Sequence, residues 1–338
     1  SGGNYQRGKA SMADTGNRKH VVVFGGAGYI GSSLCRQLLD AGWRVTAFDR
    51  LLFGDHGIHE LKQHAHFTLY CGDLRRLDEV SAVLQRDVDA VILLAALVGE
   101  KACDLDERET VDTNFIGAKL VAETCKYYGI PRMIFASTDS TYGIQDGEMF
   151  EDSPVNPISL YARLKMQIEG EFLALETGVF HPTVLRMATI YGYSPRMRFD
   201  LVINILSLHA WKSGKITVFG GEQWRPLVHV DDAAKAYVMT LAAGFDQVSG
   251  EVFNVGSNEQ NHQVGTLGGM VAEVYEGLEI ETIPQTPDLR DYRVNFDKIH
   301  RILNYEVGWQ IRDGIAGIRD ALEKGLIANH EDKKYYNA

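Results

Sequence analysis

The sequence is poor in the features that stabilise small secreted or metal-dependent proteins. Its 338 residues include four cysteines, and no two of them form a C-x-x-C pair. Closely spaced cysteine pairs are typical of structural zinc sites and of disulfide-linked secreted domains. We therefore expect reduced thiols, no metal and a cytoplasmic protein. With 45% hydrophobic residues, a chain of this length buries an ample core without cross-links.

Positive charge and long apolar runs are also scarce. The formal net charge of -11 at pH 7 would repel a nucleic-acid backbone over most of the exterior. No apolar run approaches the roughly 20 residues that a membrane-spanning helix needs. We therefore expect neither a nucleic acid nor a membrane as partner. Residues 1–17 are small, polar and non-periodic, and we interpret them as a disordered lead that includes a tag remnant.

The first ordered segment predicts a strand, a glycine-rich turn and a helix. Residues 20–24 form a short β-branched run, and 29–41 have the apolar spacing of a helix. In GGAGYIG the glycines recur at three-residue intervals, which permits a tight turn and the approach of a pyrophosphate to backbone N–H groups. We expect a dinucleotide cofactor to be contacted by Gly25, Gly28, Tyr29, Ile30 and Gly31.

The second predicted strand, 43–48, ends at Asp49. A carboxylate about 20 residues beyond the glycines can accept hydrogen bonds from both ribose hydroxyls of the adenosine and repels a 2′-phosphate, which favours NAD. Arg50 leaves NADP open, since a guanidinium can pair with that phosphate. Two later strand-like runs end at candidates for contacts to the adenine and the nicotinamide ribose, namely Asp73, Leu74, Ala95 and Ala96. Ordinary buried strands with small caps explain those two runs equally well.

Strand and helix alternate through the N-terminal half, with helical spacing at 114–128 and 159–176. This alternation predicts an α/β fold of the Rossmann type, a doubly wound parallel sheet that binds ligands beyond the carboxyl ends of its strands. We expect the NAD-binding domain to cover residues 18–185. Most of 186–330 is predicted to form a smaller, discontinuous substrate domain with some return to the sheet.

The stretch FASTDSTYG, 135–143, falls at the ligand edge of that sheet. Tyr161 and Lys165 in YARLK lie four residues apart, so on a helix the phenol and the ammonium share one face. A nearby cation favours the phenolate, which lowers the pKa of Tyr161 and allows it to act as a general base. Alone, a Y-x-x-x-K pair is more often part of a solvated helix face. The Thr138 hydroxyl can hold the same substrate oxygen, and this favours a catalytic role for Tyr161 and Lys165.

With these motifs the sequence resembles the extended short-chain dehydrogenase/reductases, and among them the NAD-dependent nucleotide-sugar epimerases and dehydratases. The resemblance spans about residues 20–327 and rests on GGAGYIGS, STDSTYG, YARLK, VLRMATIYGYSPRMRFDLVINIL, WRPLVHVDDAAKAY and DLRDYRVNFDKIHRILNYEVGW. It implies that Thr138, Tyr161 and Lys165 carry hydride chemistry, normally at C4 of a nucleotide-linked sugar, with NAD retained. It also implies a homodimer formed through the helices predicted at 114–128 and 159–176.

A nucleotide diphosphate needs cations, and in an acidic protein clustered arginines stand out. The later segments carry Arg186, Arg196, Arg198, Arg225, Arg290 and Arg293. Each of these could instead form a surface ion pair. We expect Arg198, Arg225 and Arg290 to bind the substrate, and Asn204 resembles the family's phosphate or base contact. For Asp231 we expect a structural role as a helix N-cap.

The residues after Thr138 bear on the reaction. In the family's 4,6-dehydratases the stretch reads Thr-Asp-Glu, and the resemblance implies an Asp acid and a Glu base. Here Asp139 and Ser140 follow, and a serine hydroxyl without a base of its own cannot abstract a C5 proton at neutral pH. This favours 4-epimerisation, with a C4 dehydrogenase that releases a 4-keto sugar as the alternative and a 4,6-dehydratase behind both. Asp139 either protonates or orients a substrate group, or caps the turn.

Two functions of other classes remain open at this point. A non-enzymatic dinucleotide sensor is compatible with the same fold, but the presence of both Tyr161 and Lys165 disfavours it. A reductase of small apolar substrates would use the same pair, and the clustered arginines disfavour it.

Overall fold

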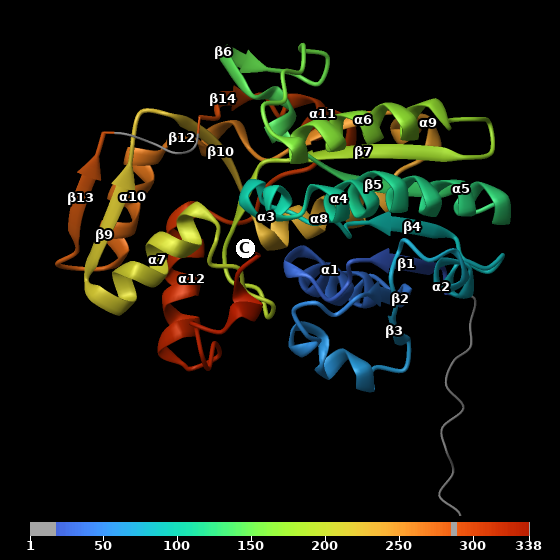
Figure 1. Ribbon diagram of the computed structural model, residues 1–338, viewed down its shortest axis with the longest axis horizontal. Helices are drawn as coiled ribbons and strands as arrows, with labels where there is room; N and C mark the ends of the chain where they lie inside the picture. The colour runs from blue at the N-terminus through green and yellow to red at the C-terminus, as the bar shows by residue number, and fades with distance from the viewer. Residues whose placement is uncertain (1–17, 285–288, 338) are drawn as a thin grey trace, which may run out of the picture.

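The computed structural model describes residues 18–284 and 289–337. At its centre lies a seven-stranded sheet in the order β11-β7-β5-β4-β1-β2-β3, and every neighbouring pair in it is parallel (Figure 1). The predicted doubly wound parallel sheet is therefore confirmed. Its strands are β1 (His20–Phe24), β2 (Arg44–Asp49), β3 (Phe67–Cys71), β4 (Ala90–Leu93), β5 (Arg132–Thr138), β7 (His181–Met187) and β11 (Val252–Val255).

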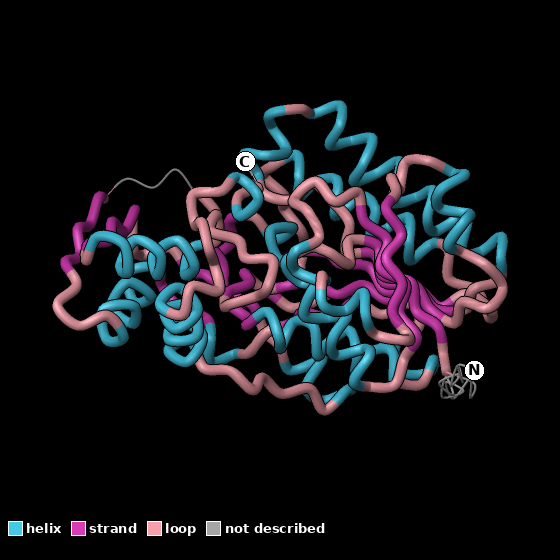
Figure 2. The backbone as a smooth tube through the Cα atoms, turned by 90° about the horizontal axis from the view of Figure 1, so that it is seen from below, coloured by secondary structure: helices cyan, strands magenta, loops and turns pink. Residues whose placement is uncertain are grey.

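The side chains of β1 alternate between two hydrophobic cores, one on each face of the sheet. Val21 and Val23 belong to a core shared with α1, α8 and α11, whereas Val22 and Phe24 belong to a core shared with α2, α5 and α6. β-branched residues on both faces are typical of a parallel sheet that helices cover on both sides, and Figure 2 shows helices on either side of the strands. These helices are α1 (Tyr29–Asp40), α2 (Leu77–Val83), α5 (Ala118–Tyr128), α6 (Leu160–Ala174), α8 (Val230–Ala242) and α11 (Asp297–Leu303).

The two helices predicted after β4 are present with changed starts. The Ser159 hydroxyl accepts a hydrogen bond from the Ala162 N–H at 3.2 Å, so Ser159 caps α6. The beginning of the helix predicted at 114–128 is a π-helical segment, Asp112–Gly117, that precedes α5. Within it the Asn114 amide bonds both backbone groups of Leu97, at 2.7 and 2.8 Å. Through Asn114 the π-helical segment therefore fixes the loop that follows β4.

A second lobe packs beside the sheet and has its own core, which α7, α10, α12 and β9 share. β7 runs to Met187, past the predicted boundary at residue 185, and β11 returns the chain to the main sheet. The division into two domains remains a prediction. No helix in the described part of the chain is both long and apolar enough to cross a membrane. The remaining elements are α3 (Glu100–Leu105), α4 (Glu107–Val111), β6 (Ile144–Met149), β8 (Thr189–Tyr191), α7 (Val202–Ser213), β9 (Lys215–Phe219), β10 (Trp224–His229), α9 (Phe245–Val248), β12 (Asn261–Gln263), α10 (Val264–Val274), β13 (Glu279–Ile283), β14 (Asp291–Val294) and α12 (Ile311–Glu323).

The packing of α1 against the first turn predicts the effect of a single methyl group. A Cβ on Gly31 would overlap the carbonyl oxygen of Gly25, which is backbone and cannot rotate away. We expect Gly31→Ala to lower the free energy of unfolding by about 1–3 kcal/mol, as overpacking does elsewhere. Gly170→Ala in α6 is the matched control, because a Cβ there meets no atom, and it should stabilise by about 0.5–1 kcal/mol. Urea unfolding measures both, and equal effects would contradict the prediction.

Candidate active site

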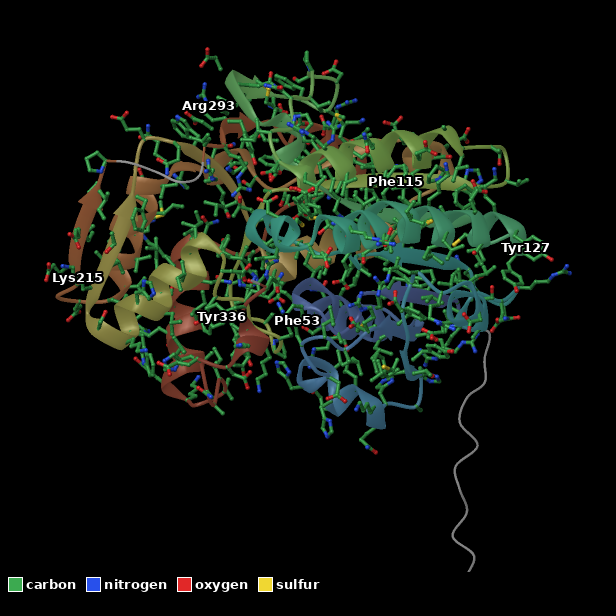
Figure 3. The ribbon with its side chains drawn as sticks, in the orientation of Figure 1. Phe53, Phe115, Tyr127, Lys215, Arg293 and Tyr336 are labelled. Carbon is green, nitrogen blue, oxygen red and sulfur yellow. The ribbon has the colours of Figure 1, made fainter. Side chains whose placement is uncertain are left out.

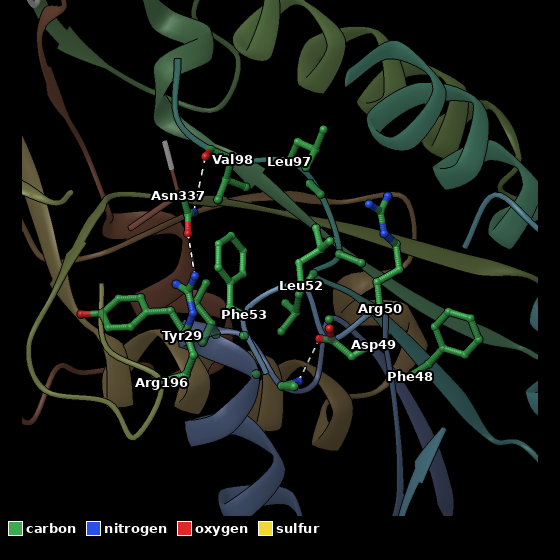
Figure 4. A pocket seen from close by; sticks show the side chains of 18 of the residues that line it. Tyr29, Phe48, Asp49, Arg50, Leu52, Phe53, Leu97, Val98, Arg196 and Asn337 are labelled. Atoms are coloured by element: carbon green, nitrogen blue, oxygen red, sulfur yellow. Dashed lines mark hydrogen bonds between the residues drawn. The ribbon is translucent and has the colours of Figure 1, made fainter. Parts of the chain in front are cut away.

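A pocket opens where the glycine turn meets the carboxyl ends of β1, β2 and β4 (Figure 4). The predicted cofactor residues on its wall are Gly25, Gly28, Tyr29, Ile30, Gly31, Asp49, Arg50, Leu74, Ala95 and Ala96. Sequence segments separated by up to about 70 residues therefore meet at one edge of the sheet, as the order of the parallel strands requires.

The turn can pack against the backbone that follows β4 only because Gly25 has no side chain. Gly25 has a φ of +86°, and a Cβ there would lie 2.7 Å from the backbone nitrogen of Ala95. Asp49 is held by backbone donors, since its Oδ2 accepts from the Ala27 N–H at 3.0 Å and its Oδ1 from the Leu51 N–H at 2.8 Å. Burial raises the pKa of Asp49, and these two N–H donors oppose the rise. A bare backbone cradle with an adjacent fixed carboxylate fits an adenosine diphosphate moiety.

The charges around Arg50 favour NAD over NADP. Arg50 Nη2 lies 2.9 Å from Glu109 Oε1, and Nη1 lies 3.7 Å from Asp73 Oδ2. A guanidinium already paired with carboxylates has little charge left for a 2′-phosphate. The Asp73 carboxylate also pairs with Arg75 at 2.6 Å, and Asp73 does not line the pocket. The expected contact from the Asp73 side chain is therefore not supported, whereas Leu74 beside it lies on the wall.

Thr138, Tyr161 and Lys165 come together at the end of β5. Lys165 Nζ donates a 2.6 Å hydrogen bond to the Ala136 carbonyl and lies 5.8 Å from the centre of the Tyr161 ring. The Tyr161 phenol is hydrogen-bonded to the Thr138 side chain. The i and i+4 positions on α6 thus point at the same strand end, as their spacing predicts. Burial lowers the pKa of Lys165 to about 8.

The pKa of Tyr161 differs from the expectation. Burial raises it above its ordinary value, and Cys103 and Asp139 raise it further, while Arg198 and the Thr138 hydrogen bond act in the opposite direction. The expected lowering by Lys165 does not appear, since the ammonium is directed at the Ala136 carbonyl. Additional positive charge beside the ring is therefore needed to stabilise the phenolate.

Asp139 is buried beside a set of residues from the second half of the chain. Its Oδ1 accepts a 3.0 Å hydrogen bond from the Tyr292 hydroxyl, and its Oδ2 has no hydrogen-bond partner among residues 18–284 and 289–337. Burial raises the pKa of Asp139 to about 7, against the opposing charges of Arg290 and Arg225. The turn itself is capped by Thr138, whose Oγ1 accepts from the Ser140 N–H at 3.1 Å. Thr138 is therefore the residue whose side chain caps this turn in the structure.

The arginines predicted to bind substrate lie in two places. Arg198 lines the cofactor pocket and pairs with Asp200 at 2.6 Å. Arg290 Nη1 donates to the Ser140 Oγ at 3.0 Å, and Arg225 donates to the backbone carbonyls of Trp224 and Arg290. Arg225 and Arg290 therefore sit together next to the segment that follows Thr138.

Asn204 lies in a different environment from the one expected. It is fully buried, and its Oδ1 accepts from the Gly192 N–H at 3.0 Å while its Nδ2 donates to the Tyr29 hydroxyl at 3.0 Å and the Arg198 carbonyl at 2.8 Å. Its amide is thus occupied by protein groups. This placement makes Asn204 an internal brace that fixes the loop after β8 against α1, in place of the predicted ligand contact.

The N-terminus of α8 also differs in detail. The cap is His229, whose Nδ1 accepts from the Asp231 N–H at 3.2 Å. The Asp231 carboxylate instead accepts from the Ser33 hydroxyl at 2.6 Å and joins α8 to α1. The predicted structural role of Asp231 holds, but the predicted cap was the wrong residue.

Four residues at the site escaped the sequence interpretation in whole or in part: Phe53, Arg196, Tyr292 and Asn337. In the sequence Arg196 is one of several clustered arginines, and nothing there indicates its role. Nothing in the composition near Asn337 distinguishes it from a polar tail, because the residues it meets lie far away in the sequence. Only the fold brings them together.

The comparisons with known proteins agree with this geometry. The family described as the NAD dependent epimerase/dehydratase family matches residues 21–256. The UDP-glucose 4-epimerase of Lactobacillus helveticus is 30% identical over 70% of this chain and 76% of its own length. The dTDP-glucose 4,6-dehydratase of Streptomyces griseus is 27% identical over 88% of this chain and 92% of its own.

A solved structure with the same fold is the UDP-glucuronic acid 4-epimerase of Bacillus cereus in complex with UDP-glucuronic acid and NAD. It has a TM-score of 0.81 and 25% identity, and the match covers 90% of this chain and 99% of that one. With a match over more than half of its length, the chain belongs to the NAD-dependent epimerase/dehydratase family. It is therefore an enzyme, and its cofactor is NAD.

The position of Asp49 and the pairing of Arg50 with Glu109 predict how cofactor preference changes. We expect Asp49→Ala to weaken NAD about 10- to 100-fold, the range for losing a charge-assisted hydrogen bond. Combining it with Glu109→Gln should strengthen NADP, because Arg50 then loses a competing carboxylate. Glu109→Gln alone is the control and should leave NAD binding nearly unchanged. Titration of both cofactors measures the ratio, and an unaltered ratio in the double variant would refute the ribose assignment of Asp49.

Proposed function

We propose that the protein epimerises a nucleotide-diphosphate sugar at C4 through a transient 4-keto sugar. The observation that carries this proposal is the environment of Ser140. In a 4,6-dehydratase this position is occupied by the base, whereas here the Ser140 hydroxyl accepts a hydrogen bond from Arg290. A hydroxyl next to a guanidinium is a poor base. Oxidation at C4 is thus supported, and elimination of water is not.

The proposed proton path starts at the C4 hydroxyl of the sugar. Thr138 and Tyr161, which contact each other, would both bind this oxygen, and the Tyr161 phenolate would take its proton. NAD, when bound, supplies the hydride acceptor and a positively charged ring next to the phenol. The same Tyr161 returns the proton when the hydride returns to the opposite face of C4, so that no atom is gained or lost.

Lys165 is proposed to act mainly by position. Its ammonium bonds the Ala136 carbonyl at the end of β5, two residues before Thr138. This bond ties α6, which carries Tyr161, to the strand that carries Thr138. The distance between the phenol and the hydroxyl is therefore fixed before the substrate arrives, which is the preorganisation that proton transfer needs.

Arg225 and Arg290 are proposed to bind the anionic part of the substrate. Both lie near the buried Asp139, and both act on its charge. A diphosphate is the anion that every nucleotide-diphosphate sugar carries, and arginine is suited to bind it. Arg198, which lines the cofactor pocket, would add a third positive charge near the reacting end of the sugar. Its charge already favours the Tyr161 phenolate.

A dimeric assembly accompanies this proposal. We infer a homodimer through α5 and α6. Two exposed apolar side chains support it: Tyr127 on α5 is 83% exposed, and Ile116 in the π-helical segment before α5 is 55% exposed. Figure 3 shows Tyr127 at the outer end of α5.

The alternative reaction is a C4 dehydrogenase that releases the 4-keto sugar, and it differs from the epimerase only in whether the ketone leaves before the hydride returns.

The reaction is tested by incubating the protein, with its NAD content known, with UDP-, GDP-, dTDP- and CDP-sugars in heavy water. We expect a product of unchanged mass, inverted at C4 and free of deuterium. Tyr161→Phe should lower the rate by about 100- to 10,000-fold while keeping NAD content within about 2-fold. Loss of water with deuterium uptake would contradict the proposal, and accumulation of a 4-keto sugar with reduced cofactor would establish the dehydrogenase.

The raised pKa of Asp139 predicts a pH-dependent stability. Its value of about 7 in the folded protein exceeds the ordinary 3.8, so folding favours the protonated carboxyl. The stabilisation is fully present below pH 3.8 and is lost as the pH rises through about 7. We therefore expect Asp139→Asn to gain stability over the natural protein between pH 5 and pH 8, by on the order of 1–3 kcal/mol.

Urea unfolding of the cofactor-free proteins at pH 5 and pH 8 measures this difference. Asp152→Asn removes the charge of an exposed aspartate and controls for the change in net charge. A difference between Asp139→Asn and the natural protein that stays constant with pH would mean that the Asp139 carboxyl titrates normally.

A further inference from the structure

Arg196 is a buried cation without a carboxylate partner. It is 2% exposed and forms no ion pair within 4 Å in residues 18–284 and 289–337, although Asp200 and Asp49 act on its charge from a greater distance. Its Nε has no hydrogen-bond partner in the same residues. A buried charge in this state is costly unless an anion pairs with it. Arg196 nevertheless lies on the wall of the NAD pocket, which suggests that the anion is part of a ligand.

The guanidinium is held in place from two sides. It stacks on the Phe53 ring at 4.0 Å from the ring centre, and its Nη2 donates a 2.7 Å hydrogen bond to Asn337 Oδ1. Asn337 in turn contacts the Val98 carbonyl, with its Nδ2 at 3.4 Å. Figure 4 shows these contacts bridging one side of the pocket. Stacking and a single hydrogen bond leave the remaining N–H donors of the fork available for a second partner.

The loop that carries Arg196 is attached to the first turn of α1. The Tyr29 hydroxyl donates to the Gly192 carbonyl at 2.6 Å, and the hydroxyls of Ser32 and Ser194 lie 2.9 Å apart. The Cβ of Arg196 lies close to Gly57, beside Ser32. Arg196 thus lines the same pocket as the first turn of α1, the place where the pyrophosphate of a dinucleotide sits in this type of fold.

We propose that Arg196 binds the pyrophosphate of NAD and that Asn337 holds its guanidinium in the orientation needed for this contact. The cofactor site would then consist of three parts: the glycine turn, the loop after β8 and the tail that contains Asn337. This assignment concerns the binding of NAD and is independent of which reaction follows at C4.

The probes are NAD, ADP-ribose and adenosine, titrated by calorimetry into protein freed of nucleotide. Arg196→Met keeps the length of the side chain and removes its charge. We expect it to weaken NAD and ADP-ribose about 10- to 100-fold, the range for a charge-assisted hydrogen bond. Adenosine, which lacks phosphates, should bind within about 2-fold of its original affinity. Arg44→Met is the control, because Arg44 pairs with Asp87 outside the pocket, and it should change none of the three affinities.

A second variant separates the contact from the packing of Arg196. Asn337→Ala keeps the guanidinium but removes the group that orients it, and we expect NAD and ADP-ribose to weaken about 3- to 10-fold. This variant decides the question if Arg196→Met does not fold. NAD affinity within about 2-fold of the natural protein in the folded variants would overturn the proposal. A loss of adenosine binding equal to the loss of NAD would also overturn it, since Arg196 would then only shape the pocket.

Discussion

The hydrogen bond from Lys165 to the Ala136 carbonyl is the interaction on which the geometry of the active site depends. It joins a helix to the end of a central strand in a place where water does not compete, and so the bond is strong and its loss would leave a buried charge. Everything that we attribute to Tyr161 presumes this fixed distance. The hydrogen bond of Lys165 to the Ala136 carbonyl is therefore at least as important here as the charge of Lys165.

A second buried network, of an ion pair and hydrogen bonds, holds the same end of β5. Glu169, one turn beyond Lys165 on α6, pairs with Arg186 at 2.8 Å and accepts a hydrogen bond from Ser137. Arg186 Nη1 also donates a hydrogen bond to the Tyr142 hydroxyl at 3.0 Å. β5, β7 and α6 are thus connected by charge-assisted bonds directly beneath the reacting groups. Such fully paired networks make a local structure rigid, even where their net effect on stability is small.

Much of this could be predicted from the sequence, for reasons that lie in local spacing. The alternation of β1, the glycine turn and the i to i+4 pair on α6 each depend on residues within a few turns of one another, and these predictions agree with the structure. Failures occurred where a side chain meets distant partners. The amide of Asn204 is occupied by Tyr29, and the pKa of Tyr161 is raised by burial that no local pattern records. Contacts between distant segments cannot be derived from periodicity.

The contact between Val98 and Asn337 spans 239 residues, and this has a consequence for biosynthesis. Chains emerge from the ribosome N-terminal end first, at about 5–20 residues per second. The glycine turn and Asp49 are therefore exposed early, while the opposite wall of the pocket is complete only after Asn337 has been added. Until Asn337 has emerged, the nascent chain displays only the half of the pocket that the glycine turn and Asp49 form.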